Sequence, residues 1–147
     1  MHGEPIHVSA SGTIAAPALA VWATVADFGT VATYLPSVAD CRLEGSGIGA
    51  RRVLTTTDGG RVVSELIELD DERLVMGYRI VETALPFEGY TSRVSVRPLD
   101  ADRCNVTWSS VLTPRETDSD DSSIDVESFL HRQLASGIEG LRRLHEP

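Results

Sequence analysis

An arginine and a glutamate in one predicted hairpin are the residues best suited to acid–base chemistry. Residues 51–66, RRVLTTTDGGRVVSEL, form two strand-like runs around an Asp-Gly-Gly turn signal at 58–60. A two-residue turn flanked by residues 57 and 60 places Arg52 opposite Glu65. Side chains two apart share a face of a sheet, so both charges are expected on a mostly apolar, inward face.

A charge pair on an inward face needs a purpose, because a buried ion pair adds little net stability. In the functional interpretation, Arg52 stabilises a carbonyl or enolate oxygen, and Glu65 exchanges the proton as general base or acid. The alternative is a structural ion pair in a cavity wall. A register change of one residue would move both side chains outside.

Aromatic residues recur on the predicted inward faces of the later strands. Tyr78, Tyr90 and Trp108 alternate with polar residues and are expected to line a pocket for a ring-bearing ligand, together with Leu54 of the hairpin. Ordinary core packing is the alternative for each of them. Tyr34, just before a proline, is predicted to rim the entrance or to lie in an exposed loop.

The C-terminal segment has the apolar spacing of a long helix, and its middle is interrupted. Gln133 and Gly137 stand within the apolar stripe, and Phe129 flanks it. A glycine weakens a helix by about 1 kcal/mol relative to alanine, so we interpret Gly137 as leaving space for a ligand. Gln133 would offer that ligand both a donor and an acceptor. Alternatively, the stripe is offset and Gln133 lies at its edge. The stripe comprises Val126, Leu130, Leu134, Ile138, Leu141 and Leu144.

These side chains must be positioned by one sheet and its covering helix. The pattern predicts a first strand at 6–14, a helix within residues 16–27 and a short helix at 29–34. Six strands then follow with short links, which favours an antiparallel meander. The final helix covers one face of the sheet, and a pocket between the two is plausible on geometric grounds. The six strands are expected at about 38–45, 51–57, 61–69, 73–84, 87–98 and 103–113.

Composition narrows the functional classes. A length of 147 residues suits one domain, 1–147, and a formal charge of −9 with a pI of about 4.8 disfavours nucleic acid and anionic membranes as partners. No apolar run approaches the ~20 residues that span a bilayer, and the start lacks the pattern of a signal peptide. Two cysteines suit a reducing cytoplasm, and the four histidines lack ligand spacing, so no metal site is expected.

Four segments carry a resemblance to a known family: IAAPALAVWATVADF, LPSVADCRLEGSGIGARRVLTTTDGGRVVSELIELDD, YRIVETALPFEGYTSRVSVRPLD and NVTWSSVLTP. With the order of the elements, they resemble the START-like (SRPBCC) superfamily, and within it the polyketide cyclase/dehydrase and lipid-transport branch. The resemblance covers nearly the whole chain. It implies an α+β helix-grip fold, in which a curled seven-stranded antiparallel sheet wraps around a long C-terminal helix over a deep hydrophobic cavity, with no obligatory cofactor.

We therefore expect a cytoplasmic protein that binds a small hydrophobic, polyketide-like or aromatic molecule. It would promote cyclisation, dehydration or isomerisation by acid–base chemistry, without a cofactor. The competing class is a non-catalytic lipid or metabolite carrier, or a ligand sensor. A protein-interaction domain ranks last, since it needs an exposed apolar patch. Both a monomer and a homodimer are compatible with the sequence.

Overall fold

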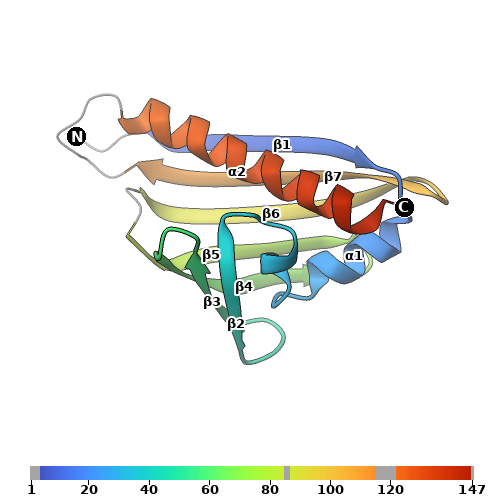
Figure 1. Ribbon diagram of the computed structural model, residues 1–147, viewed down its shortest axis with the longest axis horizontal. Helices are drawn as coiled ribbons and strands as arrows, with labels where there is room; N and C mark the ends of the chain where they lie inside the picture. The colour runs from blue at the N-terminus through green and yellow to red at the C-terminus, as the bar shows by residue number, and fades with distance from the viewer. Residues whose placement is uncertain (1–3, 85–86, 115–121, 147) are drawn as a thin grey trace.

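The computed structural model describes residues 4–84, 87–114 and 122–146 (Figure 1). The predicted order of elements is confirmed. Its elements are β1 (Ile6–Ile14), α1 (Ala18–Ala26), the 3-10 helix η1 (Val31–Thr33), β2 (Val38–Glu44), β3 (Arg51–Thr56), β4 (Arg61–Asp70), β5 (Val75–Thr83), β6 (Phe87–Asp100), β7 (Arg103–Pro114) and α2 (Ser122–His145).

All seven strands form one curled antiparallel sheet in the order β1-β7-β6-β5-β4-β3-β2, so β2 to β7 are a meander and β1 closes onto the last strand. The long helix α2 crosses one face of this sheet, while α1 and η1 lie toward one end of it (Figure 1). α2 packs mainly on β1 and β7. The half of the face formed by β3 to β6 is consequently less covered by the helix.

The apolar stripe of α2 is buried as its spacing predicts. Val126, Leu130, Leu134, Ile138 and Leu141 all enter the hydrophobic core, whereas Leu144 is 48% exposed. Inward side chains of β5, β6 and β7 belong to the same core. The inward faces predicted for Tyr78, Tyr90 and Trp108 are therefore confirmed.

The predicted register of the β3–β4 hairpin is wrong by one residue. Arg52 pairs with Ser64 and Arg51 pairs with Glu65. The loop holds three residues rather than two: the Thr56 N–H donates to the Gly60 carbonyl, and Gly59 at φ +88° provides the left-handed position. This geometry matches a three-residue hairpin turn with a bulge, which the Asp-Gly-Gly signal does not distinguish from a two-residue turn.

Candidate functional site

A cavity of about 440 Å³ lies between the first half of α2, η1 and the inner face of β3 to β6. The cavity lies here because α2 packs on β1 and β7 and leaves this part of the sheet uncovered. Residues on the β3–β4 turn and at the start of β6 also contribute to it. Its lining comprises Val31, Leu35, Ser37, Val38, Arg52, Leu54, Thr56, Thr57, Asp58, Gly60, Arg61, Val62, Ser64, Tyr78, Ile80, Thr83, Ala84, Phe87, Tyr90, Phe129, Leu130 and Gln133.

Arg52 is the buried charge of this cavity, with 2% of its surface exposed. Its guanidinium carbon lies 4.1 Å from the ring centroid of Phe28 and 4.6 Å from that of Tyr78. One terminal nitrogen, Nη1, donates to the Phe28 carbonyl at 3.3 Å, while Nε has no hydrogen-bond partner. Within the described part of the chain, Arg52 has no carboxylate partner.

This arrangement leaves a positive charge facing a mostly apolar space. An arginine stays protonated in proteins, and a buried donor without a partner carries its full desolvation penalty. The two aromatic faces offset part of that penalty. An anionic or strongly polarised oxygen entering the cavity would provide the missing partner, which makes Arg52 the strongest polar recognition point of the site.

Tyr78 and Tyr90 form an aromatic wall beside Arg52. Their ring centroids are 6.5 Å apart in a stacked arrangement, and Phe87 packs against Tyr90 with centroids 5.1 Å apart. Burial raises the pKa of Tyr90, and the neighbouring Tyr78 raises it further. The Tyr90 hydroxyl therefore keeps its proton near neutral pH.

Three other residues that the sequence analysis predicted to contact a ligand also line the cavity, one from the sheet and two from α2. Leu54, buried on β3, lines the cavity, and Phe129, 37% exposed on α2, lines it from the helix. Gln133 also lines the cavity, where its side-chain oxygen accepts a hydrogen bond from the Ser37 hydroxyl at 2.5 Å. Its acceptor is thus engaged within the protein, and its amide NH₂ group is the part left for a ligand.

Glu65 does not join Arg52. The corrected register turns it to the outer face of the sheet, where it forms ion pairs with Arg79 at 2.9 Å and with Arg51 at 3.3 Å. Hydrogen bonds from Arg79 and Arg51 hold the pKa of the Glu65 carboxyl below its usual value. The expected inward Arg52–Glu65 pair is therefore wrong, and Glu65 is a surface ion-pair residue.

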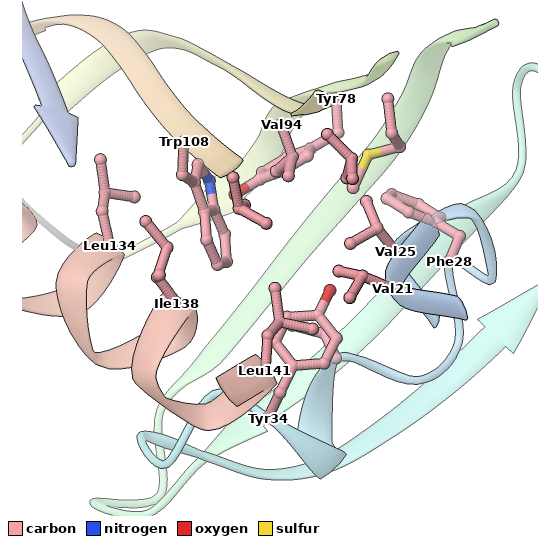
Figure 2. Close-up of a cluster of buried hydrophobic side chains, with 14 of the residues drawn as sticks. Val21, Val25, Phe28, Tyr34, Tyr78, Val94, Trp108, Leu134, Ile138 and Leu141 are labelled. Atoms are coloured by element: carbon pink, nitrogen blue, oxygen red, sulfur yellow. The ribbon is translucent and has the colours of Figure 1, made fainter. Parts of the chain in front are cut away.

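Gly137 does not create ligand space, because Trp108 fills it. A Cβ atom at Gly137 would overlap the six-membered ring of Trp108. Figure 2 shows that ring lying against α2 near Ile138 and Leu134, with Tyr34 on its other side. The ring centroids of Tyr34 and Trp108 are 6.2 Å apart. Neither Trp108 nor Gly137 lines the cavity, so the expectation that they contact a ligand is not supported by their positions.

Tyr34 is buried rather than exposed, with 3% of its surface accessible. It borders a separate hollow of about 230 Å³ between η1 and the end of α2, not the larger cavity. Burial raises the pKa of Tyr34 to about 12, although the nearby charge of Arg52 lowers it. Its position therefore supports neither the cavity rim nor an exposed loop, because Tyr34 follows η1 and packs inward against Trp108.

The chemistry available in the cavity is limited by its lining. Among the described residues that line it, Asp58 carries the only carboxylate and none is a histidine. The Asp58 side chain already accepts hydrogen bonds from Thr56 and Gly60 in the turn. The described ranges also contain no group of three histidine, cysteine, aspartate or glutamate residues that suits a metal ion. No helix in these ranges is long and apolar enough to cross a membrane.

Several residues of the site were not singled out by the sequence. Phe28 follows α1 and carries one face of the Arg52 stack, which no periodic pattern indicates. Ser64 lines the cavity only in the corrected register. Ser92 and Ser110 are buried at 3% and 2% exposure on the inward faces of β6 and β7. The only indication of these two serines in the sequence was a polar residue at a position predicted to face the apolar interior.

Comparison with known proteins places this geometry in a family. The model of the polyketide cyclase/dehydrase and lipid transport family matches residues 5–146. A Bacillus thuringiensis structure matches with a TM-score of 0.82 and 24% identity, covering 95% of this chain and 98% of that one. The Zhui aromatase/cyclase from Streptomyces sp. R1128 gives 0.79 and 24%, covering 97% and 98%. Norcoclaurine synthase from Thalictrum flavum, in complex with dopamine and hydroxybenzaldehyde, gives 0.77 and 18%, covering 97% and 87%.

Proposed function

This chain belongs to the polyketide cyclase/dehydrase and lipid transport family, and we propose that it binds a small, largely apolar, aromatic or polyketide-like molecule and promotes its cyclisation, dehydration or isomerisation. The family supports ligand binding in the SRPBCC fold. Two fold relatives, an aromatase/cyclase and a synthase bound to dopamine and hydroxybenzaldehyde, are consistent with an aromatic ligand.

One observation carries the proposal: Arg52 is buried in the cavity wall with its Nε unpartnered. A charge in this position is retained at a cost in stability, which is typical of sites that bind developing or full negative charge. The lining around it is otherwise apolar and aromatic, including Leu54, Tyr78 and Phe87. Such a lining buries a ring system and orients it toward the guanidinium.

In the proposed reaction, Arg52 holds a ketone oxygen of the substrate. Transfer of a proton from the adjacent carbon to water places negative charge on that oxygen, and the guanidinium stabilises this enolate more strongly than the neutral ketone. The enolate carbon then forms a bond to a second carbonyl carbon, whose oxygen takes a proton from solvent. Dehydration releases a proton and hydroxide as water. The wall of Tyr78 and Tyr90 would hold the substrate in a folded conformation.

A non-catalytic carrier or sensor is the second candidate, and the lining favours it in one respect. The inward glutamate that the sequence suggested lies outside, and Asp58 is the only carboxylate among the described lining residues. Carbon deprotonation would then depend on water or on a second group of the substrate. A carrier needs neither, because Arg52 would simply bind the polar end of its ligand.

The test uses three probes: 2-naphthoate, the neutral 2-methylnaphthalene and the ketone 2-acetylnaphthalene. Calorimetric titration should show tighter binding of 2-naphthoate than of 2-methylnaphthalene, and Arg52→Gln should abolish that difference. Deuterium exchange at the ketone methyl group in D₂O, followed by mass spectrometry, should be faster with the wild-type protein than with Arg52→Gln.

Arg52-dependent binding without accelerated exchange would favour the carrier or sensor. An affinity for 2-naphthoate that Arg52→Gln leaves unchanged would refute the assignment of Arg52. Arg51→Gln, which removes a guanidinium from the outer face of the same strand, is the matched control.

A further inference from the structure

A chain of buried hydrogen bonds runs from the cavity wall into the core behind it. The Tyr90 hydroxyl lies 2.8 Å from Ser110 Oγ, and Ser110 Oγ lies 2.9 Å from Ser92 Oγ. Ser92 Oγ is also 3.0 Å from the Ser109 carbonyl oxygen and 2.8 Å from Trp108 Nε1. All three hydroxyl-bearing residues are at most 5% exposed.

Counting protons at Ser92 fixes the direction of this chain. A serine hydroxyl has one hydrogen to donate and two lone pairs that accept. The indole N–H of Trp108 can only donate, and the Ser109 carbonyl can only accept. Ser92 therefore receives from Trp108 and donates to Ser109. All three contacts are satisfied only if Ser110 donates its hydrogen to Ser92.

The same assignment of hydrogens extends from Ser110 to Tyr90 in the cavity wall. Because Ser110 has given its hydrogen to Ser92, it must accept from Tyr90. The Tyr90 hydroxyl thus directs its hydrogen away from the cavity, and its raised pKa keeps that hydrogen in place. Tyr90 lines the cavity, and a phenol oxygen that donates its hydrogen keeps lone pairs with which to accept another. If the adjacent Tyr78 hydroxyl donates to Tyr90, the Tyr78 oxygen becomes the accepting end instead, so the polarity toward a ligand is unchanged.

We propose that this chain makes the tyrosine wall a hydrogen-bond acceptor that selects ligands bearing a hydroxyl group. The inference rests on the proposed function, since it adds a second recognition point to the Arg52 site. The ligand class that satisfies both points is a hydroxylated aromatic with an acidic or carbonyl oxygen. Its charged or polarised oxygen meets the donors of Arg52, and its hydroxyl hydrogen meets the tyrosine oxygen.

The experiment compares the positional isomers of hydroxy-2-naphthoate with their methyl ethers and with 2-naphthoate itself. Calorimetric affinities of the wild-type protein should show at least one hydroxy isomer binding about three- to ten-fold tighter than both its ether and the parent, which is the range of one neutral hydrogen bond. If every ether binds as tightly as its phenol, the proposal is overturned.

Two variants test the direction of the chain. In Tyr90→Phe, the preference for the hydroxy isomer over its ether should fall to about one-fold. In Ser110→Ala, Tyr90 loses its acceptor and can turn its hydrogen to the ligand, so the preference should shift toward the ether, which only accepts. A hydroxyl preference that survives both variants overturns the inference. Ser95→Ala, on the same strand as Tyr90 and paired with Thr107, is the folding control.

The probes separate this inference from the proposed function. Arg52→Gln should weaken all the naphthoates alike and leave the ratio of phenol to ether intact. If Arg52→Gln has no effect on the parent 2-naphthoate, the proposed function fails while the ratio still decides the role of Tyr90. If none of the naphthoates binds the wild-type protein, both proposals are overturned.

Discussion

Replacing Arg52 by methionine should stabilise the fold while it weakens binding of an anionic ligand. The guanidinium is buried with an unpartnered Nε, and its Nη1 donates to the Phe28 carbonyl. Methionine has a similar reach without a charge, and its thioether suits the space between the rings of Phe28 and Tyr78. The change therefore removes the charge and keeps most of the packing.

The size of the stability change on Arg52→Met follows from opposing contributions to the free energy of unfolding. Burying an ion costs several kcal/mol, and each desolvated stacking contact with a ring returns about 2 kcal/mol. The hydrogen bond to the carbonyl returns roughly another 1.5 kcal/mol, so the guanidinium contributes little net stability. A buried apolar side chain of this size contributes about 2 kcal/mol. We expect Arg52→Met to raise the free energy of unfolding by about 1–3 kcal/mol.

Urea denaturation at neutral pH, followed by tryptophan fluorescence, measures this change. An unchanged slope of unfolding free energy against urea would show that the compactness of both states is preserved. Arg51→Met on the outer face is the control, and it should have a small effect because its ion pair with Glu65 is solvent-accessible. A loss of more than about 1 kcal/mol in Arg52→Met would refute the reasoning, since Arg52 would then be a structural cation.

Three further predictions concern residues around the site. Gly137→Ala should destabilise the protein by about 1–2 kcal/mol in urea denaturation, because overlap with Trp108 outweighs the gain in helix propensity, and a smaller penalty is expected in a Trp108→Leu background. Glu65→Gln should leave 2-naphthoate affinity unchanged in calorimetry. Because the folded pKa of Glu65 is depressed, its stabilisation is present above the usual value of 4.5 and is lost on acidification, so the wild type should lose more stability at low pH than Glu65→Gln. Folding raises the pKa of Tyr34 from 10.0 to about 12, so the folded state favours the neutral phenol. The resulting contribution to the free energy of unfolding is present below pH 10 and should be lost between pH 10 and 12. Tyr34→Phe should lose less stability over this range, as measured by phenolate absorbance and circular dichroism.

The fold was predictable because its evidence is distributed along the chain. Period-two strands, short turns and one long apolar stripe each indicate the same architecture, and the strand bounds agree with the structure to within a few residues. Small errors in single elements, such as the extension of the stripe to the exposed Leu144, do not change it.

The site was less predictable because it depends on single-residue register. The inward position of Arg52 was predicted correctly, whereas its expected partner Glu65 depended on a turn length that Asp-Gly-Gly leaves undetermined. Likewise, a glycine in an apolar stripe indicates close approach by some neighbour, and the sequence does not say whether a ligand or Trp108 approaches. Such questions are decided by contacts between residues far apart in the chain.

The polarity of the cavity wall depends on which residue pair closes the β3–β4 turn. Thr56 and Gly60 close it here, which keeps Ser64 opposite Arg52 and Glu65 on the outer face. Closure by Thr57 and Gly60 around a two-residue turn would shift β4 by one position, and such a shift exchanges the two faces of a strand. Glu65 would then turn inward beside Arg52, and Ser64 would leave the cavity. A wall that attracts anions would become a neutral ion pair able to exchange protons, without any substitution in either strand.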